Sequence, residues 1–322
     1  MYNILEKKEL ILILGCDTLL GKRLRSGDTI GIVSPSGALE PEKIKDSIKF
    51  LNGLGFKTKE GKHIYDRWGY LAGKDIDRVQ DLMDMFLDPE VDMVLCTRGG
   101  YGTARLLDLM DFDIIKRNPK IFAGFSDITA LLNSIFQKCN IITFHSPMCN
   151  TDFDDFTLKS FLNTIMSGYT PFTIENPENI STDHFNGDYA SGKLVGGNLS
   201  LICSLLGTPY AVNTEDKILF IEDVNEEPYK IDRMLTQLIL SGDLPKCRGF
   251  IMGQFKNCQL PNYERSLTLN EILEDRILSL KKPTLINFQS GHSYPRITLP
   301  IGTNVEVDFK EGKINLLEPV VK

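Results

Sequence analysis

Short apolar segments alternate with amphipathic stretches through the first half of the chain. The apolar segments predict buried strands at residues 29–33, 91–96, 121–124 and 141–144. Between them, apolar side chains recur at helical spacing, which predicts helices around residues 44–54, 76–86, 104–109 and 128–136. Strands and helices that alternate in this way form a parallel sheet covered by helices on both faces.

The same alternation resumes after a polar, turn-rich segment at residues 175–187. Strands are predicted at residues 193–195, 218–221, 249–252 and 284–288, and helices at 231–239 and 269–280. Gly196 and Gly197 are expected to open a further helix, and residues 297–309 and 313–317 to form a β-hairpin region. We therefore expect an N-terminal domain over residues 1–165, a linker over 166–190 and a C-terminal domain over 191–322.

Four loops of the first half follow the predicted strands directly. They are residues 34–37, 98–102, 125–127 and 145–147. In open α/β sheets, ligands bind at the edge where the carboxyl ends of the strands meet. These four loops should therefore converge around a common site.

Charge and apolar content narrow the class of protein. The chain has 322 residues and a net charge of -7, which argues against nucleic-acid binding through basic patches. Its longest aliphatic run, residues 10–14, is too short to cross a bilayer. Glu6 and Glu9 stand where a signal peptide carries basic residues. We expect a cytoplasmic protein that binds neither nucleic acid nor membrane.

The seven cysteines are scattered along the chain and form no CxxC pair. This pattern is typical of reduced, buried thiols rather than of disulfides or zinc ligands. A lipoprotein cleavage site at Cys16 is the less favoured interpretation.

Ser126 lies between a predicted strand and a predicted helix, two residues after Gly124. This is the setting of a nucleophile elbow, which exposes a serine hydroxyl at a helix N-terminus. The backbone N–H of Asp127 and the helix dipole would then stabilise an oxyanion. Serine is also a preferred N-cap, and Ile128 stands where the G-x-S-x-G motif has its second glycine. The pattern alone leaves both roles open.

A serine nucleophile needs a base, and the chain has four histidines. His63 and His184 lie in polar segments, where solvated side chains are expected. His145 and His292 each follow a predicted strand, and the pattern does not choose between them.

Two adjacent carboxylates, Glu222 and Asp223, follow the strand at residues 218–221. A third group must orient the base, and neighbours on a strand face opposite sides. One of the two acids would therefore orient the base, while ordinary loop acids remain the alternative.

The segment at residues 98–102, with the sequence RGGYG, has two interpretations. Its glycines would let the backbone approach a ligand, with Arg98 and Tyr101 as substrate contacts and Arg98 binding a carboxylate. Arg233 and Arg296 are further candidates for that carboxylate. A tight strand-to-helix turn is the plain alternative. The segment matches neither G-x-G-x-x-G nor the P-loop, which disfavours nucleotide binding.

Taken together, nine segments resemble the LD-carboxypeptidase family of serine peptidases, which includes the microcin C immunity peptidases. They recur in order from about residue 24 to residue 302, and the ordered set is specific although each piece is weak alone. The segments are GDTIGIVSPS (27–36), RGGYG (98–102), GFSDIT (124–129), FHSPM (144–148), GGNLS (196–200), LFIEDV (219–224), PYKIDRML (228–235), GH (291–292) and TLPIG (298–302).

The resemblance implies a catalytic triad of Ser126, Glu222 and His292, and an oxyanion hole of backbone N–H groups, which we place at Gly100 and Asp127. It implies an α/β fold with an N-terminal Rossmann-like parallel sheet and a smaller β-rich C-terminal domain, with the site between them. It calls for no metal or cofactor. A homodimer is one assembly that it allows.

The implied activity is cleavage of the L,D-bond before the terminal D-alanine of muropeptide tetrapeptides. Hydrolysis of peptidyl-nucleotide antibiotics by a related peptidase is the first alternative, and a non-catalytic ligand-binding module is the second. The sequence departs from the family in two places. Ser146 stands where members usually carry glycine, and the first 20 residues form an added stretch.

Overall fold

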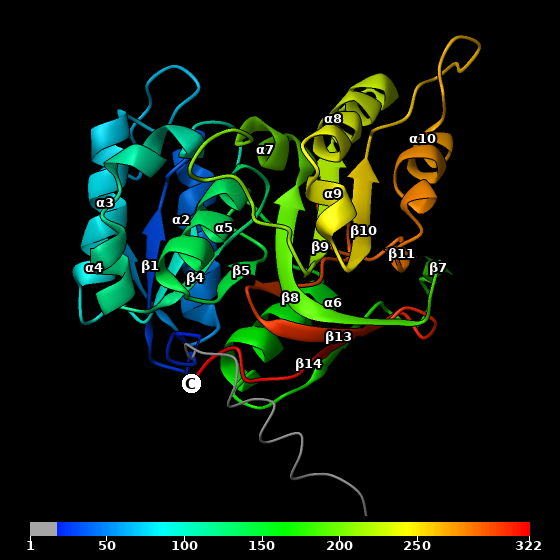
Figure 1. Cartoon of the computed structure of the whole chain (residues 1–322). Helices are drawn as coiled ribbons and strands as arrows, with labels where there is room; N and C mark the ends of the chain where they lie inside the picture. The colour runs from blue at the N-terminus through cyan, green and yellow to red at the C-terminus, as the bar shows by residue number, and fades with distance from the viewer. Residues whose placement is uncertain (1–17) are drawn as a thin grey trace, which may run out of the picture.

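The computed structural model describes residues 18–322, which form two sheets with helices packed around them (Figure 1). The aliphatic run at residues 10–14, the acids before it and Cys16 lie outside the described residues, as does most of the added N-terminal stretch. Both sheets carry parallel strands at their centres, so the expected α/β fold is confirmed.

The first sheet has six strands in the order β12-β5-β4-β3-β1-β2. Five run parallel, and β12, from the end of the chain, closes one edge antiparallel to β5. Four of these strands were predicted; β2 was not, because it is a polar, mostly exposed edge strand with no apolar pattern. The strands are β1 (Thr29–Val33), β2 (Lys57–Glu60), β3 (Met93–Cys96), β4 (Ile121–Gly124), β5 (Thr143–His145) and β12 (Leu299–Ile301).

Helices cover both faces of this sheet, as the alternating pattern predicts (Figure 1). They are α2 (Pro41–Gly53), α3 (Asp75–Leu87), α4 (Phe112–Arg117) and α5 (Thr129–Cys139), with 3-10 segments η1 (Thr103–Leu109) and η2 (Ser126–Ile128). The helix α2 begins with a proline at its first position, where a missing N–H costs nothing.

The second sheet has eight strands in the order β6-β14-β13-β8-β9-β10-β11-β7. Its four central strands, β8 to β11, run parallel, and the outer strands pair antiparallel. The strands are β6 (Thr173–Glu175), β7 (Asp183–Phe185), β8 (Tyr189–Asn198), β9 (Lys217–Val224), β10 (Gly249–Lys256), β11 (Thr284–Ile286), β13 (Asn304–Asp308) and β14 (Lys313–Leu316).

The helices of the second half lie mainly along the yellow and orange strands of this sheet (Figure 1). They are α7 (Leu199–Ser204), α8 (Pro228–Leu240), α9 (Asp243–Lys246) and α10 (Leu269–Arg276), followed by η4 (Leu278–Leu280). In the sequence between β5 and β6, the chain forms α6 (Asp155–Leu162) and the π-helical turn η3 (Asn163–Ser167).

The two halves are more interwoven than the expected linker suggests. Residues 166–190 contribute β6 and β7, one at each edge of the second sheet, and β12 returns to the first sheet. Gly196 and Gly197 belong to β8 rather than to the start of a helix, since α7 begins at Leu199. At the C-terminus, Lys322 pairs through its backbone with Gly21 and Arg23.

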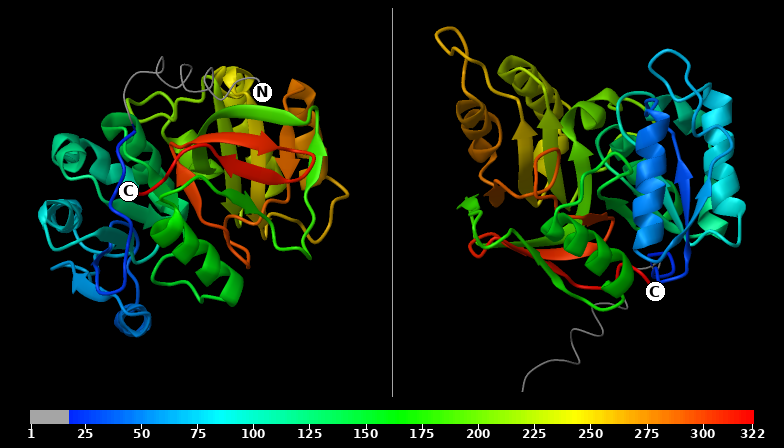
Figure 2. Two further views of the ribbon diagram at one scale, coloured as in Figure 1. Left: turned by 90° about the horizontal axis from the view of Figure 1, so that it is seen from below. Right: turned by 180° about the vertical axis from the view of Figure 1, so that it is seen from behind.

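Polar contacts fix α5 against β8. The Asn133 side chain donates to the Gly196 carbonyl at 2.9 Å and accepts from the Gly196 N–H at 3.0 Å. Thr129 Oγ1 accepts from the Asn198 N–H at 3.0 Å. Figure 2 shows the two halves from below and from behind, with the green helices between the two sheets. Because these groups are buried, replacing Asn133 by an apolar residue would leave the Gly196 backbone unpaired at a cost of roughly 1–3 kcal/mol.

Six cysteines fall within residues 18–322, and all six are free and buried, in agreement with the expected reduced thiols. Burial raises the pKa of each of these thiols. Within the same range, no helix combines the length and the apolar character needed to cross a membrane.

Candidate active site

Ser126 occupies a strained turn directly after β4. Its φ is 64°, in the left-handed region that residues with a side chain seldom adopt. The N-cap residues of η2 and α5, the segments that follow, are Phe125 and Ile128, so Ser126 is not the N-cap of either. A serine with this backbone, between a buried strand and a helix, has the geometry of a nucleophile elbow.

The glycine loop after β3 approaches the Ser126 side chain closely. A Cβ atom placed on Gly99 would lie 2.7 Å from Ser126 Cβ and 2.9 Å from Ser126 Oγ. The next residue, Gly100, has a φ of 127° and lies over the backbone of Gly37. The glycine loop at Gly99 and Gly100 therefore lies close to the serine.

The buried Asp127 side chain ties three of the four loops together. Its Oδ2 accepts hydrogen bonds from Ser36 Oγ at 2.6 Å and from the Thr103 N–H at 2.9 Å. Thr103 Oγ1 in turn donates to the Asp127 carbonyl at 2.6 Å. The loops after β1, β3 and β4 thus converge as the sequence predicted. The sequence assigned Asp127 only a backbone role and missed this clamp.

The Glu222 carboxylate and the His292 ring are in direct hydrogen-bonding contact. Glu222 lies near the end of β9, in register with Asn198 of β8, and it is completely buried. Its Oε2 lies 2.6 Å from His292 Nδ1. A Cβ atom on Gly291 would lie 2.9 Å from Glu222 Oε2, so the glycine before His292 makes room for the carboxylate.

Burial alone would raise the pKa of Glu222, but the charge of His292, with a further contribution from His145, lowers it to about 2. The ionised carboxylate can only accept, so His292 Nδ1 carries the proton of this hydrogen bond. The other ring nitrogen, Nε2, is then the one that can exchange a proton with a substrate.

His145 approaches the same carboxylate from the other side. Its Nε2 lies 3.9 Å from Glu222 Oε1, and neither atom has a hydrogen-bond partner within residues 18–322. This distance is too long for a hydrogen bond. Its Nδ1 lies 3.4 Å from Ser290 Oγ. The sequence pattern did not choose between His145 and His292 as the base. In the structure both histidines lie next to the Glu222 carboxylate, but only His292 is within hydrogen-bonding distance of it.

The Phe125 ring connects the serine turn to these histidines. Its centroid lies 4.8 Å from that of His292 and 5.7 Å from that of His145. The His292 ring thus packs against the residue just before Ser126. Within the described residues Ser126 Oγ forms no hydrogen bond to His292, a contact that in many enzymes tightens only when substrate binds.

Asp223, the neighbour of Glu222, faces away from this cluster. Its carboxylate accepts from Asn198 Nδ2 at 2.9 Å, from the Ser200 N–H at 3.0 Å, from Ser200 Oγ at 2.8 Å and from the Val224 N–H at 2.8 Å. Burial nevertheless leaves its pKa raised. Asp223 therefore fastens the end of β9 to the start of α7.

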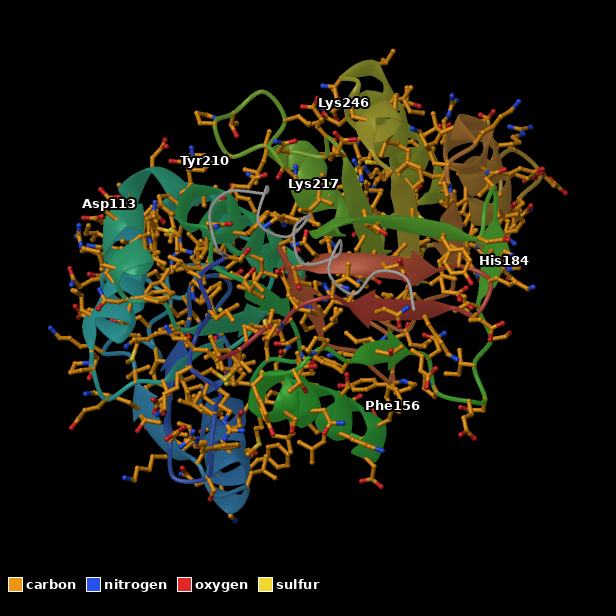
Figure 3. All side chains as sticks on the ribbon, turned by 60° about the horizontal axis from the view of Figure 1, so that its bottom comes forward. Asp113, Phe156, His184, Tyr210, Lys217 and Lys246 are labelled. Atoms are coloured by element: carbon orange, nitrogen blue, oxygen red, sulfur yellow. The ribbon has the colours of Figure 1, made fainter. Side chains whose placement is uncertain are left out.

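The other two histidines lie elsewhere. His63 is paired with Asp81, with 2.8 Å between Nδ1 and Oδ1. His184 is exposed on β7, at the outer edge of the second sheet (Figure 3). The structure brings neither of them to Ser126.

The predicted substrate contacts have other partners or are exposed. Arg98 donates to the carbonyls of Gly99 at 3.0 Å and Ala38 at 3.3 Å. Tyr101 is 53% exposed, and its ring lies 5.8 Å from that of Tyr70. Arg233 is exposed on α8. Arg296, by contrast, lies beside His292, as described below.

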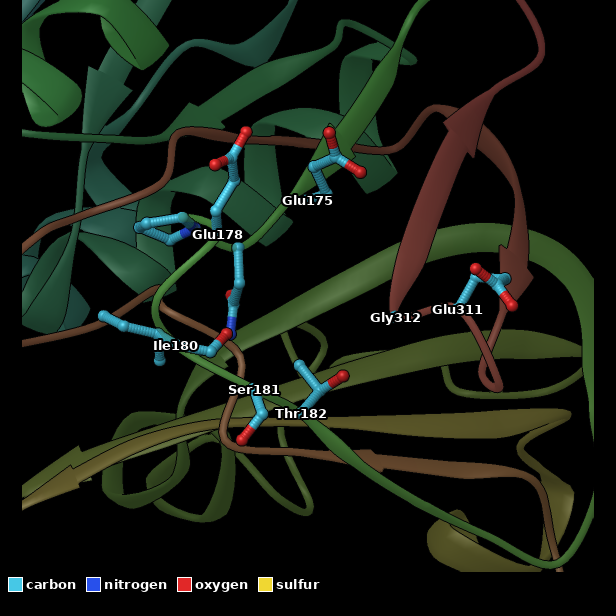
Figure 4. A pocket seen from close by; sticks show the side chains of 9 residues that line it. Glu175, Glu178, Ile180, Ser181, Thr182, Glu311 and Gly312 are labelled. Atoms are coloured by element: carbon cyan, nitrogen blue, oxygen red, sulfur yellow. The ribbon is translucent and has the colours of Figure 1, made fainter.

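A pocket of about 280 Å³ lies at the far end of the second sheet (Figure 4). Residues 175–178 and 180–182 line it together with Glu311 and Gly312, and it includes none of the predicted site residues. Within residues 18–322, no group of three or more His, Cys, Asp or Glu side chains is placed to hold a metal ion.

Comparison with known proteins covers both halves of the chain. The sequence matches the LD-carboxypeptidase N-terminal domain over residues 30–146 and the LD-carboxypeptidase C-terminal domain over residues 191–307. It is 43% identical over 295 residues to the probable murein peptide carboxypeptidase of Bacillus subtilis (strain 168), covering 90% of this chain and 92% of that protein.

Two solved structures are also similar. The muramoyltetrapeptide carboxypeptidase from Oxalobacter formigenes has a TM-score of 0.78 at 31% identity, covering 89% of this chain and 97% of that one. MccF in complex with glutamyl sulfamoyl guanosine has a TM-score of 0.88 at 26% identity, covering 94% and 100%. The resemblance inferred from the ordered motifs is confirmed. The chain belongs to the LD-carboxypeptidase family of serine peptidases.

Proposed function

We propose that this protein is a serine carboxypeptidase that cleaves the L,D-peptide bond before the terminal D-alanine of muropeptide tetrapeptides. The observation that carries the proposal is the 2.6 Å contact between Glu222 and His292 beside the strained Ser126 turn. Family membership supports the peptidase activity. The names of the Bacillus subtilis relative and of the Oxalobacter formigenes enzyme support the substrate class.

In the proposed mechanism His292 Nε2 takes the proton of Ser126 Oγ as the oxygen attacks the scissile carbonyl. Glu222 fixes the tautomer of His292 and stabilises the imidazolium that forms. The tetrahedral intermediate collapses when His292 gives the proton to the departing amine of D-alanine. A water molecule, deprotonated by His292, then attacks the acyl-enzyme, and His292 returns this proton to Ser126 Oγ as the shortened peptide leaves.

The oxyanion of the intermediate needs preorganised donors next to the serine. We assign this role to the backbone N–H groups of Gly100 and Asp127. The close approach of Gly99 to Ser126 supports the first, because the N–H of Gly100 belongs to the peptide that follows Gly99. Removing one such donor typically costs roughly 10²–10³ in kcat.

A second candidate is hydrolysis of peptidyl-nucleotide compounds. The TM-score of 0.88 with MccF, in a structure that holds glutamyl sulfamoyl guanosine, favours it. The same three residues would carry both reactions, since both release an acyl group from a leaving group through a serine ester. The substrate loops would decide between them.

We also propose that the protein works in the cytoplasm, on peptides recovered from the cell wall, and that it forms a homodimer. The free, buried thiols support the location. Light scattering after gel filtration tests the dimer.

Incubation with a muropeptide tetrapeptide, followed by mass spectrometry, tests the main proposal. We expect loss of one alanine from the tetrapeptide and slow or no turnover of an aminoacyl sulfamoyl nucleoside offered in parallel. Turnover of the nucleoside compound alone would contradict the main proposal and support hydrolysis of peptidyl-nucleotide compounds instead. Turnover of neither would contradict the peptidase proposal.

A further inference from the structure

The Arg296 guanidinium lies between two aromatic rings beside the catalytic histidine. Its Cζ is 4.9 Å from the centroid of Phe125 and 4.2 Å from that of Tyr294. Its Nη2 donates to the His292 carbonyl at 3.2 Å, and its Nη1 to Thr151 Oγ1 at 3.3 Å. The two rings and these bonds hold the side chain in one orientation, so the cation is preorganised rather than free to swing into solvent.

Arg296 forms no ion pair with any carboxylate of residues 18–322. No carboxylate oxygen lies within 4.0 Å of its nitrogens within residues 18–322, and its buried Nε has no hydrogen-bond partner. The carboxylates of Glu222, Asp152 and Asp154 act on this cation only at longer range, and that of Asp154 caps α6 by accepting from Thr157. Burial of an unpaired guanidinium is unfavourable, and its pKa is accordingly lowered. A bound anion would remove this cost.

The chemistry of the site indicates where an anion from the substrate would lie. His292 must protonate the departing amine, so the leaving amino acid sits on the His292 side of Ser126. In an α-amino acid the carboxylate is attached to the carbon next to that amine. The group that binds the carboxylate must therefore also lie near His292, away from the oxyanion hole.

Arg296 satisfies this condition, and Arg98 does not. Arg296 is bonded to the backbone of His292 itself, and with Phe125, His145 and Gly291 it lines a narrow crevice beside the catalytic histidine. Arg98 lies in the glycine loop on the oxyanion side and donates to the carbonyls of Gly99 and Ala38.

We propose that Arg296 binds the free α-carboxylate of the substrate's C-terminal residue, and so makes the enzyme an exopeptidase. The inference rests on the proposed carboxypeptidase function. It assigns the specificity for a free C-terminus to Arg296, in place of Arg98, which the sequence favoured.

The test compares two substrates that differ only in this charge: a tetrapeptide ending in D-alanine and the same peptide ending in D-alaninamide. The kcat/KM for each is measured with the wild type, Arg296→Met, and Arg98→Met as the matched control. We expect the wild type to prefer the acid, by roughly 10- to 100-fold for a charge-assisted contact. Arg296→Met should lose most of this preference, while Arg98→Met should keep it.

A purely structural role for Arg296 predicts a different result. Loss of ring stacking would lower kcat/KM for both peptides equally and leave the preference unchanged, and that outcome overturns the assignment. Arg296→Lys keeps the charge but not the planar fork, so its preference should fall below that of the wild type. An unchanged preference in Arg296→Gln, which removes the charge, also overturns the assignment, even if Arg296→Met does not fold.

The proposed function is tested by the wild type alone, independently of the variants. If the wild type releases D-alanine from the acid peptide, the peptidase proposal stands whatever the variants show. If it releases none, that proposal and the role of Arg296 are both contradicted.

Discussion

The two sides of the site are held in place by different forces. On the Ser126 side, backbone geometry does the positioning: a φ of 64°, a glycine that leaves no room for a methyl group, and the Asp127 clamp. On the Glu222 side, the electrostatic interaction of a buried carboxylate positions the groups, since the completely buried Glu222 lies between His145 and His292. Substitutions on the Ser126 side should therefore lower activity by displacing the serine. Those on the Glu222 side should act through ionisation and depend on pH.

The largest effect on the charged side is expected for Glu222→Gln. The amide keeps the shape but neither stabilises the imidazolium nor fixes the His292 tautomer. In a comparable triad the equivalent change costs on the order of 10⁴ in kcat. Steady-state kinetics on the tetrapeptide measures it.

Asp223→Asn is the matched control, because the two acids are adjacent and equally conservative to replace. It loses charge-assisted bonds to Ser200 and Asn198, so we expect lower stability, by roughly 1–3 kcal/mol, with kcat little changed. A larger kcat loss for Asp223→Asn than for Glu222→Gln would show that the wrong carboxylate was chosen.

On the Ser126 side, Gly99→Ala should lower kcat by roughly 10²-fold, because misplacing a reacting group by about 1 Å costs that much. The new methyl group would lie 2.7 Å from Ser126 Cβ, so the serine turn has to shift. The loss should be the same across the pH range. Gly53→Ala is the control, since nothing lies within 4 Å of a Cβ atom there. Equal kinetics for the two variants would refute the role of close packing.

A smaller effect is expected for His145→Gln, on the order of tenfold in kcat, or ~1.4 kcal/mol. The more telling measurement is thermal stability at pH 7 and pH 3. The pKa of Glu222 is about 2 when folded and 4.5 in its unperturbed state. Ionised Glu222 therefore stabilises the fold above about pH 4.5, and this stabilisation is lost as the pH falls toward 2.

Without His145 the folded pKa of Glu222 should rise, which shrinks that contribution. The difference in Tm between pH 7 and pH 3 should then be smaller in His145→Gln than in the wild type. An identical difference in both proteins would mean that His145 does not contribute to the ionisation of Glu222.

The contrast between the two sides also explains what the sequence could predict. Strands β1, β3, β4 and β5 and the turn at Ser126 follow from local apolar patterns and turn residues, which depend on near neighbours along the chain. The polar strands β2, β6 and β7 carry no such pattern and form only because an edge was available for pairing.

The contacts of His145 and Arg296 illustrate what local patterns leave out. His145 meets Glu222 across 77 positions of sequence, and Arg296 meets Phe125 across 171, distances over which periodicity carries no information. Family resemblance chose His292 over His145. It did not reveal that both histidines share one carboxylate, since that requires β5 and β9 to be placed relative to each other.

The central claim is that Ser126 is the nucleophile, and Ser126→Ala tests it most directly. The substitution removes one oxygen from a partly exposed side chain that caps no helix, so the protein should fold with a Tm close to that of the wild type. Release of D-alanine from the tetrapeptide should fall on the order of 10⁶-fold, as in other serine peptidases that lose the nucleophile. A folded Ser126→Ala protein that releases D-alanine at a rate near that of the wild type would contradict the proposed mechanism.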